Sequence, residues 1–298
     1  MASLTAIVLG SAAGGGFPQW NCRCPVCELA WAGDPRVAPR TQAGLAVSAD
    51  GERWTLINAS PDLRQQIQTT PALHPRGLRT SPIEAVVLTG AEIDQIAGLL
   101  SLREGTPFAL YATRETHAAV NANAMYSALQ AMPRETVMLG QPFPFRGGLT
   151  AELFAVPGKA PLYREGENPV LDAETEATAG IELCAAGKRL VFIPGAAAVT
   201  PAMRERCMRA DVVLFDGTLY TDDEMQKRGV GEKTGRRMGH MPIAGAEGSL
   251  AALRAVECRR IYVHINNTNP ILIAGSSERK IVEAAGWEIA HDGMEIML

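Results

Sequence analysis

Short apolar runs separated by polar, glycine-rich turns recur along the chain and predict a fold built largely on strands. Residues 85–88 and 211–215 are apolar with little alternation, which is typical of strands buried on both faces. Strands are also expected over residues 5–11, 44–48, 54–58, 108–112, 181–185, 189–193 and 260–264, with a β-rich stretch over 136–156 and a final strand pair near the end of the sequence.

Helices are expected between these strands. Ser60 followed by Pro61, and Thr200 followed by Pro201, each match an N-cap and the first helical position. The helices are predicted over residues 60–69, 96–103, 115–131, 244–256 and 277–285, and from residue 200 onward. Residues 157–179 show little periodicity and are predicted to form a long loop. This mixture favours packed sheets with helices outside, in one domain or two similar halves.

Charge and composition narrow the class of protein. The 298 residues include 28 Lys and Arg against 32 Asp and Glu, so the formal charge is −4. A general nucleic-acid binder would show a basic excess or stripe, so we expect no nucleic-acid partner. No apolar run approaches the roughly 18 residues of a membrane span, so no membrane insertion is expected. The first residues have no basic region of the secretory kind, and we therefore expect a cytoplasmic protein.

Three cysteines lie within six residues of one another and indicate a metal site. Cys22, Cys24 and Cys27 sit in a glycine- and proline-rich stretch, where three thiolates can bind one tetrahedral zinc ion. A site of this kind would be structural, because it would pin a loop that has little core of its own. The fourth ligand is left open between Asn267, His240 and water.

Polar side chains follow several of the predicted strands. Asp94 follows the strand at 85–88, Asp216 ends the strand at 211–215, and His264 ends the strand at 260–264. His240 lies in a loop rich in glycine. Each residue alone would be an ordinary turn or cap residue. Two carboxylates and two imidazoles that converge would instead suit zinc, iron or manganese, and the carboxyl ends of strands are where α/β active sites gather.

Two loop segments bear on this candidate site. Residues 266–270, Asn-Asn-Thr-Asn-Pro, either hold a tight turn through their own side chains or orient His264 from behind. The glycine run at 14–16 follows the first strand but lacks the G-x-G-x-x-G spacing. We therefore predict a turn there and no nucleotide cofactor.

Segments spread along nearly the whole chain carry a resemblance to a known family. They include VLGSAAGGGFPQWNCRCPVC at 8–27 and HINNTNP at 264–270, with further matches at 58–62, 98–104, 216–218, 229–236, 238–240 and 291–294. The chain resembles the PqqB family of pyrroloquinoline quinone (PQQ) biosynthesis proteins. The resemblance implies an α+β, metallo-β-lactamase-like αββα sandwich, with two packed mixed sheets and helices on the outer faces, as one domain over 1–298.

The resemblance implies two alternative activities. One is an iron-dependent oxygenase that hydroxylates the tyrosine ring of a Glu–Tyr-derived precursor. The other is a carrier that binds PQQ or its precursor and moves it to the periplasm. The partners implied are this small precursor and other proteins of the pathway, and a homodimer is left open. Lys233, Arg236 and Arg237 are candidates for pairing with substrate carboxylates, the alternative being a solvated basic turn.

The sequence departs from the metallo-β-lactamase signature H-x-H-x-D-H. The matching stretch is residues 90–95, in which only Asp94 is kept and Gln95 stands in the last position. Without the leading histidines a two-metal hydrolase is not expected. A single-metal site from Asp94, His264 and either His240 or Asp216 would approximate the two-histidine, one-carboxylate arrangement of the iron oxygenases that the resemblance implies. Because a Gln oxygen is a weaker ligand than an imidazole, Gln95 predicts lower iron affinity or a different ligand set.

Overall fold

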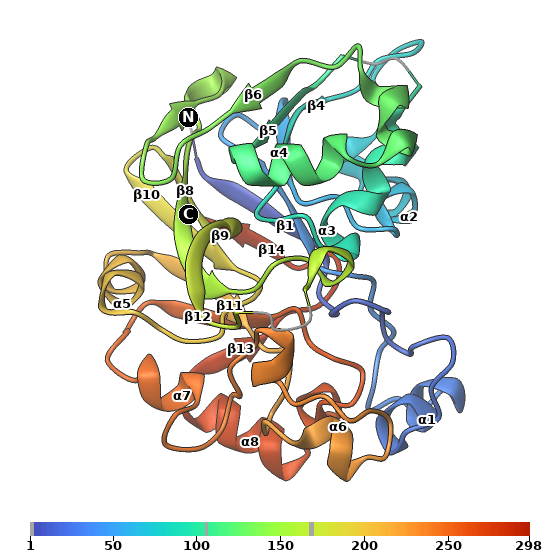
Figure 1. Cartoon of the computed structure of the whole chain (residues 1–298), viewed down its shortest axis with the longest axis vertical. Coiled ribbons are helices and arrows are strands. Elements are labelled where there is room, and N and C mark those ends of the chain that lie inside the picture. The colour runs from blue at the N-terminus through green and yellow to red at the C-terminus, as the bar shows by residue number, and fades with distance from the viewer. Residues whose placement is uncertain (1–2, 105–106, 167–169) are drawn as a thin grey trace.

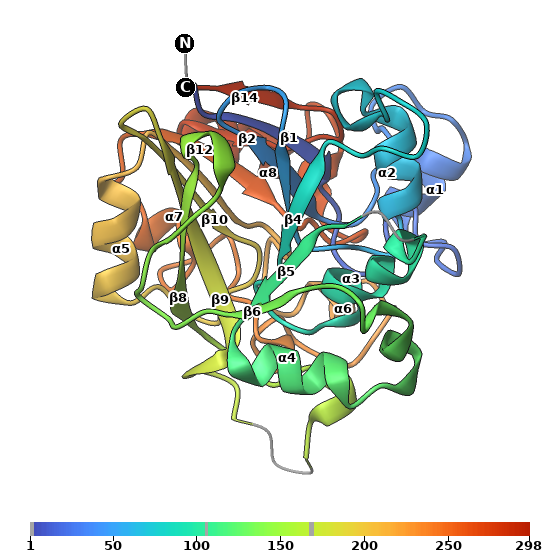
Figure 2. The ribbon, with the colours of Figure 1, turned by 90° about the horizontal axis from the view of Figure 1, so that it is seen from above.

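Two seven-stranded mixed sheets pack face to face, with helices on their outer sides. This architecture is seen in a computed structural model of the chain that describes residues 3–104, 107–166 and 170–298. Figure 2 shows the two sheets as separate layers, with α5 outside one of them and α2 and α4 outside the other. The αββα sandwich implied by the resemblance is therefore confirmed.

The first sheet has the strand order β14-β1-β2-β3-β4-β5-β6. Its strands are β1 (Thr5–Gly10), β2 (Gly44–Ser48), β3 (Trp54–Ile57), β4 (Ile83–Val87), β5 (Ala109–Ala112), β6 (Arg134–Thr136) and β14 (Glu295–Met297). The second sheet has the order β13-β12-β11-β10-β9-β8-β7. Its strands are β7 (Phe143–Pro144), β8 (Thr150–Gly158), β9 (Ala173–Ala185), β10 (Lys188–Ile193), β11 (Val212–Asp216), β12 (Arg259–Val263) and β13 (Trp287–Ile289).

The helices are short. The α-helices are α1 (Pro25–Trp31), α2 (Leu63–Thr69), α3 (Ile93–Ile96), α4 (Arg114–Asn121), α5 (Pro201–Met208), α6 (Glu224–Lys227), α7 (Ser249–Ala252) and α8 (Ser277–Ala284). Turns of 3₁₀ helix occur at Pro71–Leu73, Ala97–Leu102, Ala124–Leu129, Arg146–Gly148, Leu162–Arg164, Arg236–Met238 and Pro270–Leu272. Among the described residues, no helix combines the length and hydropathy that crossing a bilayer requires.

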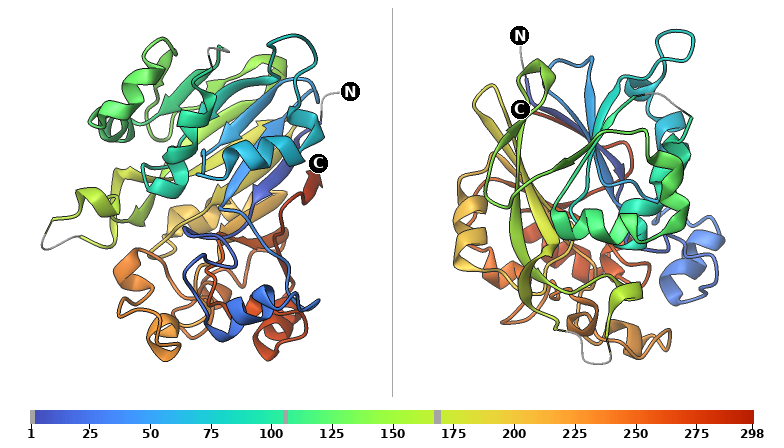
Figure 3. Two further views of the ribbon diagram at one scale, coloured as in Figure 1. Left: turned by 90° about the vertical axis from the view of Figure 1, so that its right-hand side faces the viewer. Right: turned by 45° about the horizontal axis from the view of Figure 1, so that its top comes forward.

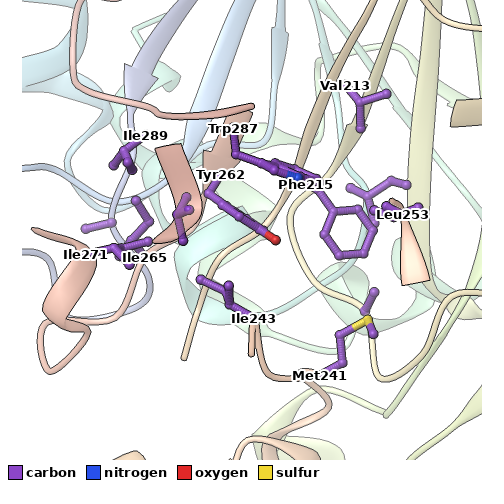
Figure 4. Packing of buried hydrophobic residues seen from close by; sticks show 14 of the residues in the cluster. Val213, Phe215, Met241, Ile243, Leu253, Tyr262, Ile265, Ile271, Trp287 and Ile289 are labelled. Carbon is purple, nitrogen blue, oxygen red and sulfur yellow. The ribbon is translucent and has the colours of Figure 1, made fainter. Parts of the chain in front are cut away.

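Buried side chains fill the space between the sheets and beneath the helices. The cluster between the sheets draws on strands of both, such as Val8 and Leu45 from the first and Phe192 from the second. A second cluster lies between the second sheet and its helices, where Tyr262 and Trp287 stack with ring centroids 4.1 Å apart (Figure 4). These two clusters hold the second sheet rigid on both faces, so the loops at its strand ends have a fixed base.

Parallel pairing brings the candidate residues to one edge of the sandwich. Strands β10, β11, β12 and β13 run parallel, so their carboxyl ends lie on the same side. Asp216 is the last residue of β11, and His264 directly follows β12. Helix α1 and its loop lie near α6 and α8 at one end of the molecule (Figures 1 and 3).

The loop predicted over 157–179 is partly wrong. Strands β8 and β9 continue their antiparallel pairing to the pairs Pro157–Glu174 and Gly158–Ala173, past an irregularity between Ala155 and Pro157. This irregularity interrupts the alternation of inward- and outward-facing residues, so the sequence does not show the pattern typical of a strand here. The connection is therefore shorter than expected.

Two predicted helices are wrong in extent, and a third is wrong in type. In the stretch 244–256 only α7 is helical, because Ala244 donates its backbone N–H to Tyr220 and Gly245 has a φ of +92°. In 115–131 an extended Asn123 separates α4 from a 3₁₀ turn. The segment 96–103 is a 3₁₀ continuation of α3, where a Cβ on Gly98 would lie 1.9 Å from the Ser60 carbonyl oxygen.

Of the two helix starts marked by Pro, one is confirmed. Thr200 caps α5 by accepting the N–H of Met203. Ser60 is buried, and its hydroxyl donates to Gln66 rather than capping a helix, so α2 begins at Leu63. The tight Ala186–Gly187 turn joins β9 to β10 as predicted.

The prediction that the last two strands form a pair is wrong. β13 joins β12 in the second sheet, whereas β14 joins β1 in the first. Between them, Asp292 accepts hydrogen bonds from the backbone and hydroxyl of both Ser11 and Thr41. The end of the chain therefore crosses from one sheet to the other and fastens the first strand in place.

Candidate functional site

Asp216 is fully buried at the end of β11 and accepts four hydrogen bonds. Its Oδ1 accepts the N–H and hydroxyl of Thr218 at 3.0 and 2.6 Å. Its Oδ2 accepts the N–H of Ala196 at 3.0 Å and lies 2.7 Å from Nδ1 of His240. Burial by itself would raise the pKa of Asp216, but the charge and hydrogen bond of His240 outweigh it and lower that pKa.

His264 and Asp94 meet across the two sheets. Nε2 of His264 lies 2.9 Å from Oδ2 of Asp94, and each side chain is 13% exposed. Burial alone would lower the pKa of His264, but the hydrogen bond and charge of Asp94 raise it overall. Burial alone would raise the pKa of Asp94, and His264 lowers it overall. Without a bound cation the two side chains thus form an ion pair.

Thr218 connects the two imidazoles. Its hydroxyl oxygen lies 2.8 Å from Nδ1 of His264 and 3.1 Å from Nδ1 of His240. The two rings stack with centroids 5.1 Å apart. Since the Thr218 hydroxyl donates to Asp216, it accepts from His264, which places a proton on Nδ1 of that ring. The Nδ1 of His240 faces the Asp216 carboxylate, which places a proton on that nitrogen as well. The Nε2 atoms are then the ones left to serve as ligands or bases.

The four predicted residues converge as the sequence suggested. Asp216, His240 and His264 each offer one ligand atom within 4.8 Å of the others, and Asp94 joins them through His264. Asp94, His240 and His264 line a cleft of about 430 Å³. The cleft wall also includes Ile93, Leu162 and Met238, which supply apolar surface beside the polar cluster. A small organic molecule of moderate size fits such a cleft.

Gln95 lines this cleft but is occupied by local hydrogen bonds. Its Oε1 accepts the N–H of Glu92 at 3.1 Å, which completes a capping box at the start of α3. Its Nε2 donates to the Thr89 hydroxyl at 3.4 Å. A Cβ on Gly90 would lie 2.6 Å from Oε1, so only glycine leaves room for this arrangement. Gln95 therefore holds the turn that carries Asp94.

The three clustered cysteines form a second candidate metal site. Cys22, Cys24 and Cys27 are buried, and their sulfur atoms lie within 4.8 Å of one another. Nδ2 of Asn267 lies 3.2, 3.8 and 3.3 Å from the three sulfurs in that order. His240 lies in the other cluster. Of the two candidate protein ligands, the structure brings Asn267 to the thiols.

Burial sets the charge of these thiols. It raises the pKa of Cys27 to about 12, although hydrogen bonds from the Gln19 backbone and the Asn267 side chain act in the opposite direction. Burial also raises the pKa of Cys24. The metal-free thiols of Cys24 and Cys27 are therefore neutral at physiological pH. A zinc ion would displace their protons and supply the positive charge that a buried thiolate cluster requires.

The predicted basic residues behave differently from one another. Lys233 lines the cleft. Arg236 pairs with Glu247 at 2.6 Å and Arg237 with Glu165 at 3.0 Å, and neither lines the cleft. Sequence reasoning missed Lys159, which lines the cleft with its Nζ 3.0 Å from Glu92 and 2.5 Å from Glu165. Lys159 lies in the segment that is predicted to be a long loop, so the sequence does not indicate that its side chain faces the cleft.

Comparison with known proteins shows strong similarity along the whole chain. A family model described as "Beta-lactamase superfamily domain" matches residues 53–265. Coenzyme PQQ synthesis protein B from Methylobacterium nodulans is 56% identical over 299 residues, covering 99% of this chain and 100% of that protein. The protein of the same name from Rhizobium meliloti is 53% identical, with 99% and 98% covered.

Solved structures agree with the sequence comparison. The crystal structure of zinc-bound PqqB from Methylobacterium extorquens matches with a TM-score of 0.97 and 55% identity, covering 99% of this chain and 100% of that chain. A diphosphatase from the PhnP family matches with a TM-score of 0.69 but 19% identity, with 99% and 97% covered, and so shares the fold alone.

Proposed function

Because this chain belongs to the coenzyme PQQ synthesis protein B family of the β-lactamase superfamily, we propose that it serves PQQ biosynthesis as an iron-dependent oxygenase. Its substrate would be a Glu–Tyr-derived precursor, hydroxylated on the tyrosine ring. The observation that carries this proposal is the 2.9 Å approach of His264 Nε2 to Asp94 Oδ2 in the wall of the cleft. An imidazole and a carboxylate brought this close across two sheets can share a proton or one cation.

The donor set fits a single ferrous ion. Asp94, His264 and His240 would hold it, in the two-imidazole, one-carboxylate set that leaves positions open for dioxygen and substrate. Ferrous iron bound there would supply the one-electron chemistry with dioxygen that ring hydroxylation requires. The side chain of Gln95 is held in place, because its Oε1 accepts from the Glu92 N–H and its Nε2 donates to Thr89.

Asp216 and Thr218 position the imidazoles. Asp216 accepts from Nδ1 of His240 and Thr218 accepts from Nδ1 of His264, so Nε2 is the atom of each ring that would face the cation. At His264 the cation would take the place of the proton that Nε2 shares with Asp94. These partners are themselves fixed by the backbone N–H groups of Ala196 and Thr218. A carboxylate behind a ligating imidazole raises its basicity and fixes its orientation.

The cleft supplies the remaining substrate contacts. Ile93, Leu162 and Met238 would pack against the aromatic ring, and Lys233 would pair with a carboxylate of the precursor. Lys159 is held by two glutamates and would instead keep the wall of the cleft rigid. Zinc at the three thiolates would have a structural role, pinning residues 22–27 against the turn at Asn267.

The commitment of Gln95 to its capping box favours a second candidate function. With one ligand position unused, the cleft could bind PQQ or its precursor without redox chemistry and act as a carrier. The two functions differ in their need for iron, because a carrier binds its ligand equally well with or without the metal.

One experiment separates these functions. Zinc-loaded protein is titrated anaerobically with ferrous iron, then exposed to dioxygen, a reductant and a Glu–Tyr peptide, with products followed by mass spectrometry. One iron per chain and a product gaining one oxygen atom would support the oxygenase. Iron-independent binding of precursor or PQQ, with no oxygenated product, would support the carrier and reject the oxygenase.

A further inference from the structure

One short turn carries residues of both candidate metal sites. It begins at His264, whose ring faces Asp94, and three residues later Asn267 faces the three thiols. The side chains of Asn266, Asn267, Thr268 and Asn269 are all buried. Two sites that look separate in the sequence are thus joined by three peptide units of buried chain.

Asn267 is the only asparagine of this turn whose side chain reaches the sulfurs in the described part of the chain. Its amide nitrogen contacts all three, and its backbone carbonyl oxygen lies 3.7 Å from the sulfur of Cys24 and 4.0 Å from that of Cys27. Asn266 bonds to Thr268, and Asn269 bonds to the carbonyl oxygens of Gly217 and Thr218. Asn267 is therefore the point at which the thiol cluster holds the turn.

The backbone conformation of His264 has to be restrained by its neighbours. Its φ of +57° is in the left-handed region, which a residue with a β-carbon adopts only when its surroundings impose it. The next residue, Ile265, donates its N–H to the Ser11 carbonyl and accepts the N–H of Ala13. The backbone N–H of Asn266 then donates to the Thr218 carbonyl. The anchor at Asn267 completes the restraint on the C-terminal side.

We propose that Asn267 is a positioning residue that couples zinc at the thiols to the orientation of His264. Zinc draws the three sulfurs and Asn267 into one rigid unit. The turn then has a single arrangement, in which Nε2 of His264 faces Asp94. Without that unit the turn can relax, and His264 spends less time oriented toward Asp94. This inference rests on the proposed function in one respect, that the imidazole–carboxylate site binds a ferrous ion.

The test is an anaerobic ferrous-iron titration of zinc-loaded protein, comparing the unsubstituted chain with Asn267→Ala. We expect Asn267→Ala to bind ferrous iron about tenfold or more weakly, the range seen when partners behind a ligand are removed. Leu73→Ala controls for lost stability alone, because Leu73 is buried in a separate cluster under the first sheet. It should bind iron with unchanged affinity.

Each outcome has one meaning. Equal iron affinity in Asn267→Ala and the unsubstituted chain would overturn the coupling and leave the oxygenase proposal intact. Failure of the unsubstituted chain to bind iron would instead reject the oxygenase. A loss of affinity of the same size in Leu73→Ala would also overturn the coupling, since stability alone would then explain it.

A second measurement needs no substitution and applies even where Asn267→Ala does not fold. Coupling between two sites is reciprocal, so iron near His264 must also tighten the hold on zinc. The equilibrium affinity for zinc is measured anaerobically by competition with a zinc-selective chelator, with and without ferrous iron. The affinity for zinc should rise severalfold when iron is present. Identical affinities would contradict the proposal.

Discussion

His264 and Asp94 stand 170 positions apart in the sequence, yet their Nε2 and Oδ2 atoms lie 2.9 Å apart. The contact joins the end of β12 in the second sheet to α3 beside the first, so it exists only when the two sheets are packed together. Replacing His264 by Ala should weaken ferrous-iron binding at least about tenfold and abolish oxygenation, because a ligand is lost. The fold should remain, since the hydrophobic clusters are untouched.

Iron titration and circular dichroism measure these two effects for His264→Ala. His74→Ala is the matched control, because His74 is an exposed imidazole outside the cleft. Undiminished iron binding by His264→Ala would remove His264 from the ligand set.

Asp216→Asn should destabilise the protein, because all four partners of this carboxylate donate a hydrogen bond to it and none accepts one. An amide has one oxygen, and its NH₂ group would face donors that need an acceptor. We expect the free energy of unfolding to fall by about 2–4 kcal/mol and the orientation of His240 to be lost. Urea denaturation checks the first effect. Asp211→Asn, at a partly exposed position just before the same strand, should cost much less.

Gln95→His should strengthen ferrous-iron binding by about tenfold, because it adds an imidazole next to Asp94. The same change breaks the capping box of α3, which should cost about 1 kcal/mol of stability. Gln95→Leu separates the effects, since it breaks the capping box without adding a ligand. Equal iron affinity in Gln95→His and Gln95→Leu would show that position 95 does not reach the cation.

Cys24→Ser should lower the zinc content and reduce the free energy of unfolding by at least about 2 kcal/mol. Metal analysis and thermal denaturation measure the two effects, and Cys184→Ser, outside the cluster, is the control.

Burial raises the pKa of Cys27 to about 12, so zinc binding must release protons. Zinc affinity of the stripped protein should therefore rise with pH, and a flat dependence from pH 6 to 8 would contradict thiolate ligation.

Glu224 should make the protein less stable as the pH rises. It is buried, its carboxylate accepts from Thr268 and the Tyr220 N–H, and burial raises its pKa to about 7. The folded state keeps this proton between pH 4.5 and 7 while the unfolded chain loses it. The free energy of unfolding should thus fall over that window by on the order of 3 kcal/mol, and stay lower above it.

Denaturant unfolding at a series of pH values tests this expectation for Glu224. The Glu224→Gln variant cannot ionise and should lack this part of the pH dependence. Glu205→Gln, at an exposed position, should keep it. A pH profile for Glu224→Gln that parallels the unsubstituted protein would show that Glu224 is not the group responsible.

The residues that end strands could be predicted from the sequence, whereas those that support them could not. Asp216 and His264 follow apolar runs, and parallel strands necessarily bring such ends together. Thr218 is an ordinary turn residue in the sequence, and its link to both imidazoles depends on the packing of the loop of His240 against β11 and β12. Lys159 was hidden by the irregularity in β8, which interrupts the strand pattern.

Long-range contacts also account for the wrong boundaries. The capping pattern at Ser60 is sound locally, but the preceding residue, Ala59, is held by distant backbone groups, since it donates its N–H to Gln95 and accepts that of Gly98. The predicted helix over 244–256 gives way to backbone hydrogen bonds from Ile243 and Ala244 to Leu219 and Tyr220. In both places tertiary partners outweigh the local preference for a helix.

The position of β14 has a consequence for how the protein is made. β1 is synthesised well before β14, the strand that covers its outer edge. The same delay applies to Asp292, which fastens Ser11 and Thr41. During translation β1 therefore presents an unpaired strand edge, the kind of surface through which nascent chains associate with one another. The pairing of β14 with β1 is the step that closes this edge.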